Sequence, residues 1–226
     1  MDILKWLLSN EYCLLCSGIN KSRKKPVCAV CRGDMEILSG NLCLKCGKPL
    51  ISEETLCLKC RTRTFAFSNH RSLFLYSGKI KELVRQYKFE NKMNLAWFFA
   101  EYTAEVIGSR TAVIIPVPSR KANVRQRGYD AAGLISTVLR KKYGCNVCFA
   151  LKRSRSRSQK KLNYEERQTN LIGKIRIKKN FFKIIAGRDV ILLDDVFTTG
   201  ATMDYCASAV LSAGAKTVSC LTMAMD

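Results

Sequence analysis

Residues 190–202 read VILLDDVFTTGAT, and no other segment of the chain says as much about its fold. The apolar residues 190–193 are typical of a strand buried in a parallel sheet. Asp194 and Asp195 follow this strand, then a turn of small and hydroxyl residues and a helical pattern over 203–213. Because ligands of open α/β sheets bind beyond the carboxyl ends of strands, the segment predicts a binding site.

The turn at residues 198–202 is suited to a phosphate. Its hydroxyls and glycine stand at the start of the predicted helix, where backbone N–H groups and the positive end of the helix dipole are free. Two carboxylates beside it would repel a phosphate alone, so the pair favours a ligand that also carries sugar hydroxyls and a magnesium ion. The alternative is an ordinary strand–turn–helix unit with a capping threonine.

This arrangement resembles the phosphoribosyl-pyrophosphate (PRPP) loop of type I phosphoribosyltransferases. The resemblance implies a parallel α/β sheet flanked by helices, with Asp194 and Asp195 contacting ribose. It implies that the 5′-phosphate is held by Thr198, Thr199, Gly200, Ala201 and Thr202.

A second loop follows a predicted strand at residues 112–116, and in the same family such a loop contacts pyrophosphate. Arginine suits this task because it forms bidentate contacts with phosphate. A solvated loop is the alternative for Arg125 and Arg127. The candidate pyrophosphate ligands are Ser119, Arg120, Arg125 and Arg127.

The first 60 residues contain four C-x-x-C pairs. Two such pairs complete one tetrahedral zinc site, so four pairs predict two sites, one from the first two pairs and one from the last two. Interleaved pairing and a single metal ion stay open as alternatives. No export signal is evident, which disfavours a disulfide scaffold. The predicted ligands are Cys13, Cys16, Cys28, Cys31, Cys43, Cys46, Cys57 and Cys60.

We expect two domains, a zinc module over residues 1–64 and a phosphoribosyltransferase-like domain over residues 65–226. Metal binding should supply the folding energy of the module, which is too short and polar to build its own core. The second domain should contain strands at 71–76 and 147–151 and helices at 79–87, 93–107, 131–142 and 164–171. Core packing is the preferred role for the aromatic residues of 93–107, and a structural or surface role for His70.

The chain carries 39 Lys+Arg against 18 Asp+Glu, a formal charge of +21. This excess predicts a polyanionic partner, nucleic acid before an anionic membrane. Residues 152–183 hold 12 basic and two acidic residues. They would serve equally as a lid over pyrophosphate or as a site for single-stranded DNA. The candidate DNA contacts are Arg153, Arg155, Arg157, Lys160 and Lys161.

No apolar run approaches the roughly 20 residues that a membrane span needs. With no signal sequence evident, we expect a cytoplasmic protein without a membrane span.

Taken together, these features resemble the ComF family over nearly the whole chain. The resemblance is carried by the cysteine pairs, Pro116-Val117-Pro118, Arg125 and Arg127-Gly128-Tyr129, the series Gln159, Leu162, Arg167 and Asn170, and residues 194–202. It implies a role in DNA uptake in natural competence, with single-stranded DNA and a helicase-like competence protein as partners. Two positions depart from the family pattern, Asp130 in place of Asn and Ile175 in place of Phe.

Three functions compete at this point. The first is a DNA-uptake accessory protein that carries a PRPP-type site. The second is an active phosphoribosyltransferase that transfers phosphoribose to a base or an amine, for which the sequence identifies no catalytic residue. The third is a zinc-stapled scaffold that senses PRPP or a nucleotide without turnover. We rank the first highest, because it combines the basic charge with the family resemblance.

Overall fold

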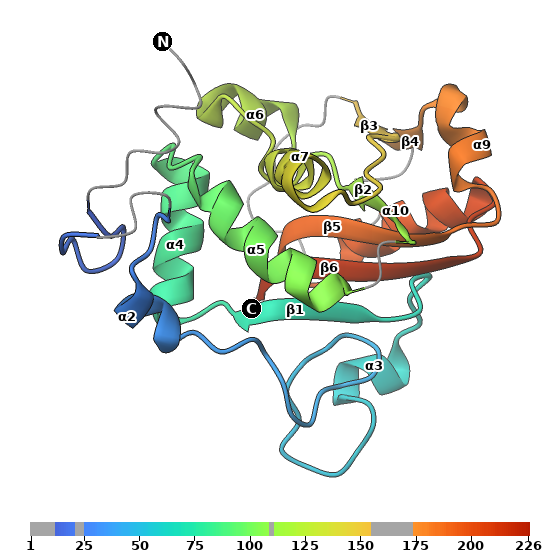
Figure 1. The fold of residues 1–226 in the computed structure, drawn as a ribbon. Helices are drawn as coiled ribbons and strands as arrows, with labels where there is room; N and C mark the ends of the chain where they lie inside the picture. The colour runs from blue at the N-terminus through green and yellow to red at the C-terminus, as the bar shows by residue number, and fades with distance from the viewer. Residues whose placement is uncertain (1–11, 21–24, 109–110, 155–173) are drawn as a thin grey trace.

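The computed structural model describes residues 12–20, 25–108, 111–154 and 174–226. Its centre is a four-stranded parallel sheet in the order β1-β6-β5-β2 (Figure 1). The sheet confirms the predicted α/β fold. Its strands are β1 (His70–Leu75), β2 (Val113–Pro116), β5 (Asp189–Phe197) and β6 (Thr217–Met225). A separate antiparallel pair joins β3 (Leu151–Arg153) to β4 (Ile175–Ile177).

Both faces of the sheet are covered, which is why its strands read as continuous apolar runs. Successive side chains alternate between the faces, so that Leu193 belongs to one hydrophobic cluster and Leu192 to the other. The first face carries α4 (Gly78–Phe89), α5 (Leu95–Ile107) and α7 (Ala131–Tyr143). The second face carries α10 (Ala201–Ser212) (Figure 1).

The two cysteine units share one local structure. Each contains an isolated antiparallel bridge, Tyr12 with Ile19 and Leu42 with Pro49. Each also has a short helix that begins after its third cysteine, α2 (Ala29–Gly33) in the first and α3 (Leu58–Thr62) in the second. We call these units the first and the second ribbon.

The ribbons pack against different hydrophobic clusters of the central sheet. The first ribbon joins the cluster of α4 and α5 through Cys13 and Cys31. The second ribbon joins the cluster of α10 through Cys43, Cys46 and Cys60. In Figure 1, α2 lies beside α4 and α3 lies below β1. The ribbons therefore share their apolar contacts with the sheet and its helices.

Several elements differ from the sequence prediction. Residues 121–127, expected as a loop, form α6 (Lys121–Arg127). The strand expected at 147–151 is wrong: Val147 makes only an isolated bridge to Ile114, and β3 begins at Leu151. After β4 come a 3-10 turn, η1 (Lys179–Phe181), and α9 (Phe182–Ile185). The helix predicted at 164–171 lies outside the described residues.

Within the part of the chain that the structure describes, no helix has the length and apolar character required to cross a membrane.

Candidate functional site

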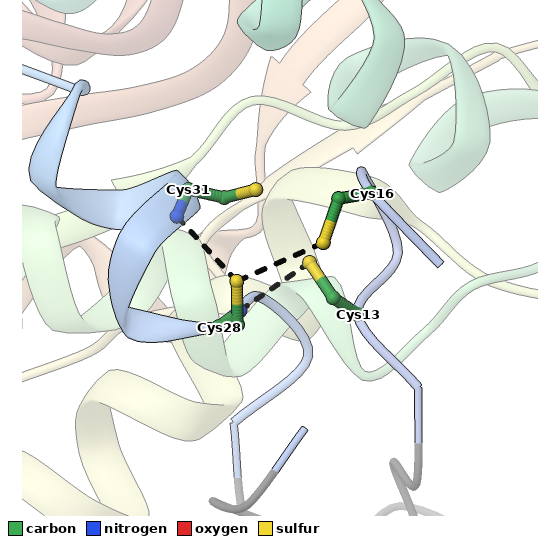
Figure 2. Close-up of side chains that lie close together, drawn as sticks. All are labelled: Cys13, Cys16, Cys28 and Cys31. Carbon is green, nitrogen blue, oxygen red and sulfur yellow. Dashed lines mark hydrogen bonds between the residues drawn. The ribbon is translucent and has the colours of Figure 1, made fainter. Parts of the chain in front are cut away.

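The eight paired cysteines form two clusters, each of four thiols. Within each cluster the sulfur atoms all lie within 4.8 Å of one another. Figure 2 shows the first cluster. The Sγ atoms of Cys16 and Cys28 are 3.9 Å apart, and those of Cys46 and Cys57 are 3.7 Å apart. A tetrahedral zinc ion with Zn–S bonds of about 2.3 Å sets its ligands about 3.8 Å apart. Both clusters therefore fit zinc, and the thiols are grouped as the sequential pairing predicts.

The charges expected in the first cluster also favour a bound cation. Burial opposes ionisation of Cys13, yet backbone N–H groups from Cys28, Cys16 and Leu15 lower its pKa to about 6. Burial and the neighbouring thiols raise the pKa of Cys31 to about 12. Four thiolates this close need a divalent cation to balance their charge.

The predicted ligand loops leave the sheet side by side. Strands β2 and β5 are parallel, with Pro116 opposite Leu193, and the Val117 N–H donates to the Leu193 carbonyl at 2.8 Å. After β5 the chain turns into α10 through Gly200, the N-cap residue, which has φ +80°. The first N–H groups of a helix have no partner within it, so this turn can receive an anion.

The two acids lie inside β5, which continues to Phe197, and not after its end as the sequence predicted. Asp195 Oδ1 is 2.8 Å from Lys88 Nζ, and Asp195 Oδ2 is 3.8 Å from Arg127 Nη1. Asp194 Oδ1 accepts the Asp195 N–H at 2.8 Å. Burial and the charge of Asp195 raise the pKa of Asp194 to about 8. The two acids thus have different environments, one paired with cations and one favouring its protonated form.

The loop after β2 is held by an acid. Ser119 N–H donates to Asp130 Oδ2 at 2.7 Å, while Asp130 Oδ1 caps α7 by accepting the Gly133 N–H at 3.0 Å. Arg120 is the N-cap residue of α6, whose last residue is Arg127. The structure brings Arg127 to the acids of β5 but leaves Arg125 exposed to solvent.

Arg153, predicted as a DNA contact, lies beside the same loop. Its Nη1 donates to the Pro118 carbonyl at 3.4 Å. Burial and the charge of Arg120 lower its pKa, and the charge of Asp194 opposes this effect. Its Nε is buried without a hydrogen-bond partner among the described residues, and so is Arg127 Nη1. The other predicted DNA contacts, Arg155, Arg157, Lys160 and Lys161, lie outside the described residues.

His70 has the structural role that the sequence favoured over catalysis. Its Nδ1 lies 2.7 Å from the Cys46 carbonyl and its Nε2 lies 2.9 Å from Thr222 Oγ1. A carbonyl can only accept, so Nδ1 donates and Nε2 accepts from Thr222. The ring also stacks on Phe197 at 3.9 Å. His70 thereby joins the second ribbon to the strand that carries the acids.

Lys88 is the residue that sequence reasoning missed. The predicted helix ended at residue 87, whereas α4 extends to Phe89 and includes Lys88. A lysine beside the apolar stripe of a helix is common, and nothing in the local pattern distinguishes one that reaches a carboxylate. Only the packing of α4 against the sheet reveals the contact.

Comparison with known proteins agrees with this architecture. A double zinc ribbon domain matches residues 3–61, and a phosphoribosyl transferase domain matches residues 122–226. Competence protein ComFC of Bacillus subtilis is 27% identical over 210 residues, covering 88% of this chain and 84% of that protein. Competence protein F of Haemophilus influenzae is 28% identical over 207 residues, covering 86% and 88%. The chain belongs to the ComF family.

A further relative of this ComF-family protein is the DNA utilization protein YhgH of Salmonella typhi. It is 28% identical over 206 residues, which cover 85% of this chain and 87% of that protein. Among solved structures, the glutamine PRPP amidotransferase of B. subtilis aligns with a TM-score of 0.42 and 15% identity, over 62% of this chain and 30% of that enzyme. The family assignment rests on the two domain matches and the full-length relatives.

Proposed function

We propose that this ComF-family protein is an accessory protein of DNA uptake that binds a PRPP-type ligand at the carboxyl ends of β5 and β2. The observation that carries the proposal is the side-by-side arrangement of an acid pair, the turn that caps α10, and two arginines, each with a buried N–H group that has no hydrogen-bond partner among the described residues. The names of the relatives, competence proteins and a DNA utilization protein, support the biological role. Cysteines grouped for zinc and not for disulfides fit a reducing compartment, and we propose the cytoplasm.

Each part of PRPP has a chemically suitable partner. The backbone N–H groups of residues 198–202 would hold the 5′-phosphate, and Asp194 and Asp195 would accept hydrogen bonds from the ribose hydroxyls. The diphosphate, with magnesium on its own oxygens, would lie toward Ser119, Arg120, Arg125 and Arg127. We add Arg153 to this group, because its burial beside Pro118 suits a diphosphate better than an extended strand of DNA.

Calorimetry tests the ligand. We expect PRPP with magnesium to bind the wild type, and the double variant Asp194→Asn/Asp195→Asn to lose that binding while it still binds a single-stranded oligonucleotide. Asp189→Asn is the matched control, because Asp189 is exposed at the opposite end of the same strand. If the wild type shows no heat with PRPP, the ligand assignment is wrong. Loss of both ligands in the double variant would mean that DNA and PRPP share one site.

A salt titration tests DNA binding. If about five phosphates are neutralised, the affinity for single strands should fall roughly a hundredfold between about 50 and about 200 mM salt. Changing Arg155, Arg157, Lys160 and Lys161 to Gln should flatten this dependence. The control removes the same number of positive charges elsewhere, by changing to Gln the exposed residues Lys59, Lys81, Lys183 and Lys216. Absence of binding at low salt would refute the DNA assignment.

Transferase activity is the second candidate, favoured by the buried N–H groups of Arg127 and Arg153 that have no hydrogen-bond partner among the described residues. In this reaction an acceptor nitrogen forms a bond to the anomeric carbon, and the bond from that carbon to the diphosphate oxygen breaks. Pyrophosphate leaves with the electron pair, and the acceptor nitrogen loses a proton to solvent. Buried donors would stabilise the charge that develops on the leaving group. An assay for pyrophosphate release with each common nucleobase decides between this function and binding without turnover.

A further inference from the structure

Lys88 belongs to a buried group of charges at the acid pair. Its Nζ lies 2.8 Å from Asp195 Oδ1, and both side chains are 16% exposed. Arg127, which is 8% exposed, approaches the other oxygen of the same carboxylate at 3.8 Å. Removing ions from water is costly unless each is paired, so the geometry of this pair must be well maintained in the folded protein.

The end of α4 that carries Lys88 is anchored on two sides. Tyr87 is fully buried, and its hydroxyl donates to the Ala131 carbonyl at 2.8 Å, while the Tyr129 hydroxyl donates back to the Tyr87 carbonyl. One residue earlier, Gln86 Nε2 donates to the Leu14 carbonyl of the first ribbon at 2.9 Å. The backbone of residues 86–88 is therefore fixed against both α7 and the first ribbon, and so is the base of the Lys88 side chain.

Lys88 also separates the roles of the two acids. It neutralises Asp195, whose backbone N–H in turn donates to Asp194. The charge of Lys88 opposes the effects that raise the pKa of Asp194, namely burial and the neighbouring carboxylate. Without this ammonium, the ion pair that remains to Asp195 among the described residues is the longer one to Arg127, at 3.8 Å.

We propose that Lys88 is a positioning residue of the phosphoribosyl site. It holds the Asp195 carboxylate in place to accept a hydrogen bond from a ribose hydroxyl. The inference rests on the proposed PRPP-type ligand and adds a residue from α4, outside both ligand loops. Lys88 acts through Asp195 and does not itself touch the ligand. Its contribution should therefore disappear when Asp195 can no longer serve as the acceptor.

Calorimetry with three probes tests this role: PRPP with magnesium, ribose 5-phosphate, and pyrophosphate with magnesium. Lys88→Met should weaken PRPP and ribose 5-phosphate by the same factor, about tenfold or more, and leave pyrophosphate unchanged. Lys88→Arg should regain most of the lost affinity, because it keeps the charge. Lys81→Met, an exposed change in the same helix, should bind all three as the wild type does.

A double-variant cycle separates positioning from direct contact. If Lys88 acts through Asp195, the combination Lys88→Met/Asp195→Ala should bind PRPP no more weakly than Asp195→Ala alone, because Ala has no acceptor oxygen. The double variant removes both the ammonium and the carboxylate, so neither charge is left buried without its partner. It can therefore be measured even if Lys88→Met does not fold. Three outcomes would overturn the inference. The affinity losses of the two single variants could multiply in the double variant, Lys88→Met could lose pyrophosphate affinity as much as PRPP affinity, or Lys88→Met could bind PRPP with wild-type affinity. If the wild type binds PRPP but one of these contradicting outcomes is found, the proposed ligand stands and only the proposed role of Lys88 is wrong. If the wild type does not bind PRPP, the proposed ligand and the role of Lys88 are both wrong.

Discussion

Single residues determine the shape of the phosphate loop, and Gly200 is the most constrained of them. It has φ +80°, and a Cβ at this position would lie 2.8 Å from Phe197 Cζ and 3.1 Å from Phe65 Cε1. Both rings are buried in the cluster that contains the second ribbon. The loop is therefore shaped as much by aromatic packing beneath it as by its own sequence.

We expect Gly200→Ala to lower the free energy of unfolding by about 2–4 kcal/mol, since left-handed backbone and a steric clash both oppose it. Gly187→Ala is the control: its φ is +70°, but nothing lies within 4 Å of the added Cβ. Urea unfolding of both variants isolates the clash. Equal losses would show that Phe197 and Phe65 yield to the added methyl.

Asp194 gives the protein a pH-dependent stability. Its pKa of about 8 in the folded state lies above the value of 3.8 expected in the unfolded chain. Between these values the folded state binds more protons than the unfolded state, so this group lowers stability as the pH rises. Asp194→Asn removes the effect, because an amide does not ionise.

The variant should therefore match the wild type near pH 4 and exceed its free energy of unfolding by about 1–3 kcal/mol above pH 8. Urea unfolding across this pH range measures the difference. Asp189→Asn, which changes an exposed carboxyl on the same strand, should show no such trend. A constant difference at every pH would contradict the assigned titration.

At the scale of elements, the sequence correctly predicted several helices, strands and cysteine units whose signal lies in the local pattern of residues. The apolar run at 190–193, the spacing of the cysteine pairs and the helical period of residues 79–87 all led to the right element. Asp130 shows the limit. In the sequence it is a departure from the Asn of the family pattern, whereas in the structure it caps α7 and holds Ser119. That function depends on a turn between two elements, which no local pattern contains.

Long-range contacts explain the remaining differences. Lys88 reaches Asp195 across more than 100 positions of sequence, and His70 reaches Thr222 over 152. Arg153 looked like the start of a basic segment, yet pairing of β3 with β4 takes its side chain into the protein. The local sequence around each of these residues does not contain its partner, so its role emerges only from the packing of elements.

His70 connects two elements, and its removal should weaken their contact. His70→Phe keeps a ring that can stack on Phe197 but leaves the Cys46 carbonyl and the Thr222 hydroxyl without this partner in a buried site. We expect a loss of about 2–4 kcal/mol in the free energy of unfolding. Arg71→Gln, an exposed change at the next position of β1, is the control. Unchanged stability would mean that water or a neighbouring group replaces both hydrogen bonds.

At the scale of the whole molecule, each ribbon contacts elements that carry a different half of the proposed ligand site. The first ribbon reaches the acid pair through the Leu14 carbonyl, Gln86 and the end of α4. The second ribbon reaches the phosphate loop through His70 and the aromatic residues beneath Gly200. Each zinc unit is therefore connected to a different part of the proposed ligand site, which gives two metal sites a role beside one ligand site.

This arrangement predicts distinct effects of losing each metal. The wild type should contain two zinc ions per chain, and Cys16→Ser and Cys57→Ser should each contain one, because each changes one ligand of one cluster. Hydrogen exchange should rise about tenfold or more in α4 for Cys16→Ser, where the Gln86 contact is lost. For Cys57→Ser it should rise in β1 and in the first turn of α10, where Ala66 N–H donates to Asp204 Oδ1 at 2.6 Å. Cys145→Ser, outside both clusters, should keep both metals and serve as the control. The same exchange pattern in both ribbon variants would instead mean that the ribbons and the sheet unfold as one unit, because loss of either metal would then release every contact together.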